Sequence, residues 1–80
     1  MSEQVLLARI VVSRDVAHGK PRVAGTRVMV YQVLDLLAAG KPVAEITSDE
    51  YFPELSADDV RACLLYASHV VKDDLIVPAA

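Results

Sequence analysis

The sequence predicts a mainly α fold, with a three-helix helix-turn-helix core preceded by a short N-terminal β-strand or hairpin segment. Three observations support this: a β-branched run near the start, apolar residues at helical spacing from residue 30 onward, and glycine or proline between the helical segments. Eighty residues form one domain. We divide it into a basic extended β segment at residues 9–30, a three-helix core at residues 30–71 and a tail at residues 72–80.

The N-terminal segment is predicted to be extended. Val5 to Val12 is apolar, and its β-branched end, Ile10 to Val12, favours a short strand. The polar stretch Ser13 to Lys20 predicts a loop. Two further extended pieces are predicted at Pro21–Val23 and Thr26–Val30. A turn is predicted between them at Ala24-Gly25, where Gly25 supplies a positive φ.

The first helix is predicted from residue 30 to residue 39. The spacing i, i+3, i+4, i+7 of its apolar residues is typical of a helix buried on one side. These residues are Val30, Val33, Leu34 and Leu37. Gly40 is expected to end the helix, and Pro42 prevents its continuation and opens a short second helix at Val43 to Ser48.

The third helix has the strongest local signals. Ser56 is predicted as its N-cap, with Asp59 completing a short-armed capping box, and Leu55 and Val60 are expected to form a hydrophobic staple. The inward apolar stripe is predicted as Val60, Cys63, Leu64, Ala67 and Val71. Three helices in about forty residues, with a tight turn between the first two, match a helix-turn-helix core.

The composition predicts association. Apolar residues make up 54% of the chain, and the mean hydropathy is +0.35. A domain of this size has a small core, so we expect apolar surface to remain for a partner, either a second copy in a homodimer or another protein in a hetero-oligomer. The alternative is a tightly packed monomer rich in Ala and Val.

The charge is unevenly distributed along the chain. The net charge is −3, yet residues 9–30 hold five cations against Asp15 alone, while residues 31–80 hold nine carboxylates against three cations. This division predicts an end that faces anions. The candidate residues for binding nucleic acid or a partner are Arg14, Lys20, Arg22, Arg27 and Arg61. The alternative is that these cations serve solubility and pair with the acidic half of another chain.

The sequence does not favour catalysis, a metal or a cofactor. His18 and His69 are fifty residues apart without metal-ligand spacing, and the adjacent Asp58 and Asp59 are explained by helix capping. Cys63 is the single cysteine, which excludes an intramolecular disulfide, and it is expected in the core. With no basic leader and no apolar stretch of about 18 residues, we expect a cytoplasmic protein without a membrane partner.

Residues Ile10 to Tyr66 resemble the domain-of-unknown-function 433 family of small bacterial and archaeal proteins. The matching motifs are Gly19-Lys20-Pro21, Gly25-Thr26-Arg27-Val28, residues 33–40 (Val-Leu-Asp-Leu-Leu-Ala-Ala-Gly), Ala44-Glu45-Ile46, Tyr51, Pro53, Leu55 and Asp59-Val60-Arg61-Ala62. The resemblance implies a homeodomain-like helix-turn-helix fold. It also implies a VapB-type antitoxin that neutralises a PIN-like ribonuclease toxin and binds its own operator DNA.

The resulting hypothesis is a non-enzymatic antitoxin whose basic segment does the binding. Asp58 and Asp59 at the start of the third helix would repel phosphates, so the extended segment is a better candidate for DNA contacts than that helix. An arginine delivered to an acidic nuclease cleft would displace its metal, and Arg22, Arg27 or Lys72 is a candidate for this. The alternatives are a stand-alone helix-turn-helix DNA-binding regulator and a protein-interaction module that does not bind DNA.

Overall fold

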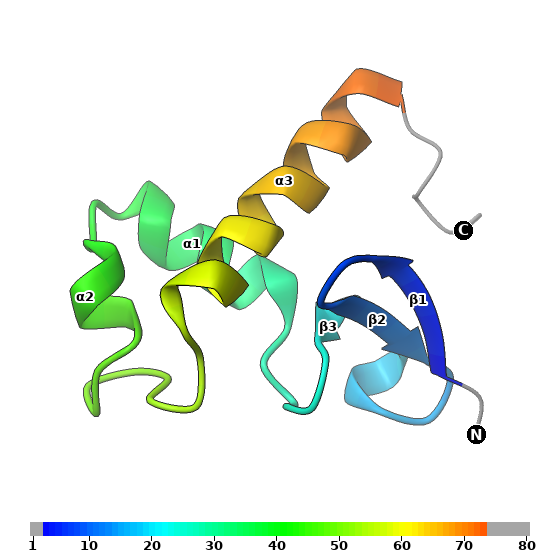
Figure 1. Cartoon of the computed structure of the whole chain (residues 1–80), viewed down its shortest axis with the longest axis horizontal. Coiled ribbons are helices and arrows are strands. Elements are labelled where there is room, and N and C mark those ends of the chain that lie inside the picture. Colours follow the sequence, from blue (N-terminus) through cyan, green and yellow to red (C-terminus); the bar gives the residue numbers. More distant parts are fainter. Residues whose placement is uncertain (1–2, 74–80) are drawn as a thin grey trace.

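A computed structural model of the chain describes residues 3–73. The elements in order are β1 (Glu3–Leu7), β2 (Ile10–Ser13), the 3-10 turn η1 (Ala17–Gly19), β3 (Arg22–Val23), α1 (Val30–Ala38), α2 (Val43–Ile46) and α3 (Ala57–Asp73). The sheet lies at one end of the molecule and α2 at the other, and α3 runs diagonally between them and projects beyond the other elements (Figure 1).

The strands form one antiparallel sheet in the order β1-β2-β3. Ile10 pairs with Val23 and Val11 with Arg22, so strand alternation places the first pair on one face of the sheet and the second pair on the other. The β1–β2 connection contains only two residues, and Arg9 within it has a φ of 72°. The apolar run at the start of the chain therefore forms a hairpin, and its turn contains Arg9 in the left-handed backbone conformation.

The ends of α1 are fixed by local hydrogen bonds. The Gln32 side chain accepts a hydrogen bond from the Met29 N–H at 2.9 Å. At the other end Gly40 has a φ of 87°, the Lys41 N–H donates to the Leu36 carbonyl, and the Gly40 N–H donates to the carbonyl of the preceding turn. This Schellman-type ending confirms the predicted stop at Gly40.

The capping box and the hydrophobic staple predicted for α3 are confirmed. The Ser56 N–H donates to Asp59 Oδ2 at 2.9 Å, and the Asp59 N–H donates to Ser56 Oγ at 3.2 Å. Leu55 and Val60 on either side are both buried. These reciprocal bonds fix the start of α3, which packs its buried side on α1, α2 and β2.

The hydrophobic core joins the inner face of the sheet to the three helices. Its buried members are Ile10, Val23, Val28, Val30, Val33, Ile46, Leu55, Val60, Ala62, Cys63 and Tyr66. Because the strands contribute Ile10 and Val23 to this cluster, the sheet is part of the core and not an appendage to a helical domain.

This architecture shows that the predicted fold class is wrong. The structure is a three-stranded antiparallel sheet followed by three helices, and a three-helix homeodomain-like core is not formed. The physical reason is that α2 is a single turn, Val43–Ile46, too short to bury a helical face, so the sheet supplies the missing apolar surface. Leu64 and Val71, both predicted to face inward on α3, are 47% and 85% exposed.

Two further findings concern the ends of the chain and membranes. Of the predicted tail, residues 74–80 lie outside the described residues. Within residues 3–73, no helix has the length and apolar character required to cross a bilayer.

Candidate partner-binding site

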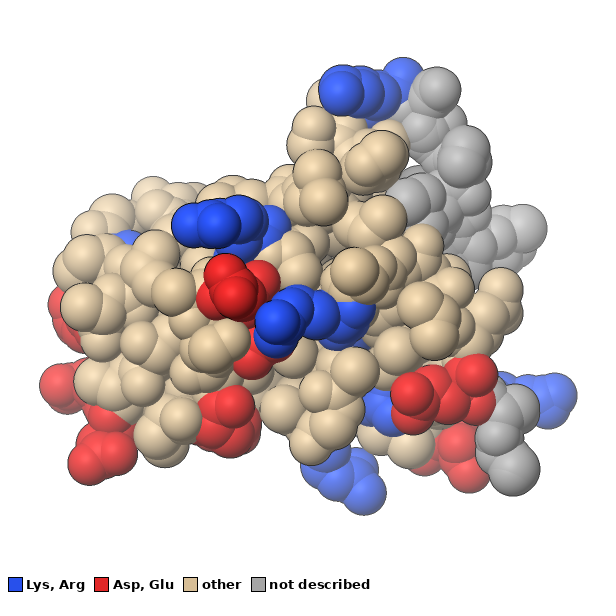
Figure 2. All heavy atoms as spheres, viewed as in Figure 1, with Lys and Arg blue, Asp and Glu red and all other residues tan. Residues whose placement is uncertain are grey.

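The cations that the sequence singles out do not form one basic surface. On the face in Figure 2, Lys and Arg side chains are interspersed with Asp and Glu. Arg14 and Arg27 line one hollow together, whereas Lys20 and Arg61 line two others and Arg22 is buried. The structure thus brings together two of the five predicted residues.

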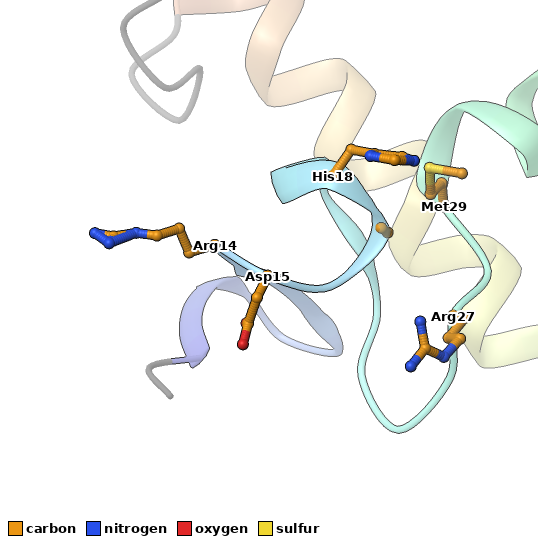
Figure 3. A pocket seen from close by; sticks show the side chains of 6 residues that line it. Arg14, Asp15, His18, Arg27 and Met29 are labelled. Carbon is orange, nitrogen blue, oxygen red and sulfur yellow. The ribbon is translucent and has the colours of Figure 1, made fainter.

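The hollow that Arg14 and Arg27 share lies between the loop after β2 and the segment that leads into α1. It measures about 460 Å³ and is lined by Arg14, Asp15, Ala17, His18, Arg27 and Met29. Figure 3 shows the His18 ring beside Met29 and the Arg27 side chain turned inward, while Arg14 extends away from the hollow. Arg27 and His18 are therefore the groups that face a bound partner, and Arg14 adds charge at the rim.

One wall of the hollow is a left-handed turn. The φ angles of Ala17, His18 and Gly19 are 53°, 57° and 75°. Hydrogen bonds of 3.0 Å from the Gly19 N–H to the Val16 carbonyl and from the Lys20 N–H to the Ala17 carbonyl close it. Each non-glycine residue in this conformation costs about 1–2 kcal/mol. Such strain is concentrated at functional sites, and here it sets the position of His18.

The opposite wall is a rigid turn that presents Arg27. Thr26 Oγ1 donates to the Val23 carbonyl at 2.9 Å and accepts from the Val28 N–H at 3.0 Å. The Val23 N–H also donates to the Val28 carbonyl at 2.9 Å, and Gly25 takes a φ of 81°. The backbone on both sides of Arg27 is thereby fixed, while its side chain is exposed.

Arg22 occupies a different environment. It lies on the sheet face opposite the core, where its Nη2 donates to Ser13 Oγ at 3.2 Å and to Glu3 Oε1 at 3.4 Å. The residue is 6% exposed, and its Nε and Nη1 atoms have no partner within residues 3–73. Arg22 is therefore a structural residue of the sheet in this conformation, and its guanidinium does not reach the surface.

The charges at the start of α3 are paired with one another. Arg9 Nη1 lies 2.9 Å from Asp59 Oδ1, and Arg61 Nη1 lies 3.8 Å from Asp58 Oδ1. Partial burial acts to raise the pKa of Asp59, but hydrogen bonds from Ser56 and Arg9 outweigh it and hold the pKa below its usual value. Arg61 is thus located among carboxylates at the start of α3.

No metal or nucleophile site accompanies the hollow. Within the described part of the chain, no three His, Cys, Asp or Glu side chains are placed to hold a metal ion. Cys63 is buried in the core, where desolvation, with a smaller effect of Asp59, raises the pKa of its thiol to about 11. The thiol is therefore neutral and enclosed.

Sequence reasoning did not identify His18, Asp15 and Met29 as residues of the hollow. From the sequence, His18 was considered only as a metal ligand. Gly19 was the strongest local sign of a left-handed turn, histidine is a weaker one, and Ala17 carries no such signal in sequence. The contact of the loop with the segment before α1 depends on tertiary packing.

The chain was compared with known proteins. Neither the curated proteins nor the solved structures gave a match. A family model described as "Protein of unknown function (DUF433)" matches residues 10–67, a region that contains the whole hollow and the first eleven residues of α3. The chain belongs to the DUF433 family.

Proposed function

We propose that this chain is an antitoxin-like binding protein that neutralises a PIN-like ribonuclease through the hollow of Arg14, His18 and Arg27. The observation that carries the proposal is the exposed Arg27 side chain, held between two fixed turns and directed into an open hollow. A guanidinium in this position is suited to a carboxylate, because its planar fork donates two parallel hydrogen bonds.

The proposed inhibition is electrostatic. A PIN-like nuclease holds its metal with clustered carboxylates. Docking of the hollow brings Arg27 to these carboxylates, and the guanidinium takes the place of the metal's positive charge. His18 and the rim residue Arg14 surround the contact. No bond is made or broken, and inhibition is reversed when the two proteins separate.

The same hollow supports the second part of the proposal, which is binding to operator DNA. Phosphate oxygens are anionic acceptors as carboxylates are, and Arg14 and Arg27 are free of ion pairs within residues 3–73. Each phosphate that one of them neutralises contributes about −0.9 to the slope of log K against log salt. The start of α3 is disfavoured for this role, since Asp58 and Asp59 occupy it.

The test is co-expression with the product of the adjacent gene, followed by co-purification and a ribonuclease assay. We expect the chain to bind and inhibit that nuclease, and Arg27→Glu to abolish inhibition while its circular dichroism is unchanged. Lys41→Glu is the matched control: it makes the same charge change in the segment before α2, where Lys41 pairs with Glu45. Equal inhibition by wild type and Arg27→Glu would contradict the proposal.

The DNA arm is tested separately with the isolated chain and the DNA upstream of its gene. We expect binding that weakens with salt, and a slope that falls by about 0.9 in magnitude for Arg27→Glu. Arg27→Lys keeps the charge and should retain the salt slope. It should lose more of the nuclease inhibition, because lysine cannot form the bidentate contact. Absence of DNA binding at about 50 mM salt would contradict the proposal that the chain binds operator DNA.

A further inference from the structure

α3 carries a second surface, which is separate from the hollow. The buried side of the helix contributes Val60, Cys63 and Tyr66 to the core. On the side turned away from it, Leu64 and Leu65 are 47% and 49% exposed. The helix projects from the body (Figure 1). Its two half-exposed leucines are adjacent and form a small apolar patch, a feature that is common at interaction sites.

The patch lies between charges of opposite sign. Asp58, Leu65 and Lys72 follow one another at intervals of seven residues, about two turns, so they form a line along the helix. In Figure 2, uncharged surface extends along α3 between a mixed group of charges near its start and positive charge near its end. Asp58 is in weak contact with Arg9 and Arg61, each at 3.8 Å, and remains 63% exposed.

We infer that this face of α3 binds a second copy of the same chain, with the two helices antiparallel and crossing at Leu65. Asp58 of each copy then lies opposite Lys72 of the other, because the two residues are equally distant from Leu65 along the helix. A second, smaller hollow of about 230 Å³ lies beside Leu65 and receives the leucine of the other copy. Ala8 and Ala62 form its apolar wall, and the charged residues Arg9, Asp58 and Arg61 form the rest of its lining.

The charge pattern favours a second copy over other occupants. A two-fold interface uses one patch twice, so the patch must be complementary to itself. Asp58 at one end, Leu65 at the centre and Lys72 at the other end meet this condition only when the two helices are antiparallel. A parallel pair would bring Asp58 to Asp58 and Lys72 to Lys72, and an anionic membrane surface would be repelled by Asp58.

Sedimentation equilibrium over about 1 µM to 1 mM, the range of weak complexes, tests the dimer. We expect the wild-type chain of 8.7 kDa to pass from monomer to dimer. Leu65→Glu is expected to remain monomeric with unchanged circular dichroism, whereas Val5→Glu, which alters a 67% exposed residue on β1, dimerises as wild type does. A wild-type chain that is monomeric throughout, or a Leu65→Glu chain that dimerises normally, overturns the inference.

Two charge reversals test the antiparallel pairing itself. Asp58→Lys and Lys72→Glu each place like charges at both ends of the interface, and we expect each to weaken its homodimer about tenfold. An equimolar mixture of the two variants has opposite charges at both ends, so it should form a heterodimer with wild-type affinity. The double variant should dimerise as wild type does. A mixture no tighter than its separate components overturns the inference.

Discussion

Replacing Arg22 with methionine is expected to stabilise the fold. The Arg22 guanidinium is buried, and of its three nitrogens only Nη2 has partners within residues 3–73. Enclosing a charge costs several kcal/mol, and each buried donor without a partner adds about 1–3 kcal/mol. The ion pair with Glu3, at 3.4 Å and with a half-exposed carboxylate, offsets about 1 kcal/mol at most.

The magnitude follows from what methionine keeps and what it removes. Its chain is similar in length, so it continues to cover the outer face of the sheet beside Val11, and it has no donors to satisfy. Exchanging a buried ion pair for apolar residues gains about 1–4 kcal/mol, from which about 1 kcal/mol is lost with the Ser13 hydrogen bond. We expect the free energy of unfolding of Arg22→Met to rise by up to about 3 kcal/mol.

Urea unfolding followed by circular dichroism measures this change. An m value equal to that of the wild type would show that the variant exposes the same surface on unfolding. Ser13→Ala and Glu3→Gln are the controls, since each keeps the buried guanidinium. The first removes a hydrogen-bond partner and the second removes the negative charge of the other partner, and each should destabilise the chain by about 1 kcal/mol. A free energy of unfolding that falls by more than about 1 kcal/mol in Arg22→Met would refute the reasoning.

The other predictions concern the core, the start of α3 and the left-handed turn. The pKa of the Cys63 thiol is about 11 in the folded chain, so the unfolded chain loses this proton at a lower pH than the folded chain does. The free energy of unfolding should therefore fall by up to about 3 kcal/mol as pH rises from about 9 to 11. Cys63→Ala should lack most of this decline. Asp59→Asn should lower the free energy of unfolding by about 1–2 kcal/mol at pH 7. It should also reduce the loss of stability on acidification below pH 3.8, since the lowered pKa of Asp59 stabilises the fold only above that range. Ala17→Gly should raise the melting temperature by relieving a φ of 53°, and an unchanged or lower value would argue against strain in that turn.

How far the sequence predicted the fold depended on how local the determining interactions are. The start of α3 and the end of α1 were predicted correctly because Ser56, Asp59 and Gly40 act within one helical turn of their own positions. An N-terminal strand or hairpin was predicted, but β1 was not predicted as a separate strand, because Arg9 at the turn carries no turn signal and β1 is fixed by pairing with β2. The second helix was expected to be short, but the predicted helix-turn-helix core was wrong because the packing of Ile10 and Val23 against the helices depends on contacts distant in sequence.

The candidate site divides in the same way. Arg22 and Arg27 are five residues apart in one basic segment and look equivalent in sequence. Arg22 lies in a strand, where alternation directs its side chain to the outer face of the sheet under the loop after β2. Arg27 lies in the following turn, where the backbone is fixed and the side chain is exposed. The pairing register, which depends on contacts across the sheet, therefore decides which arginine is structural and which is available to a partner.

The hollow and the exposed face of α3 belong to different elements, so their functions can be separated. Arg27→Glu should leave dimerisation unchanged. Leu65→Glu should leave the hollow of each copy intact. It should weaken binding only because a second copy is no longer attached. The affinity should therefore fall by about 10²–10⁴ for a target that presents two sites and stay unchanged for a target that presents one. Measuring both variants against the same nuclease, in monomeric and dimeric form, distinguishes these cases. A loss of affinity in Leu65→Glu towards a monomeric target would mean that α3 itself contacts the nuclease, and the division into two surfaces would fail.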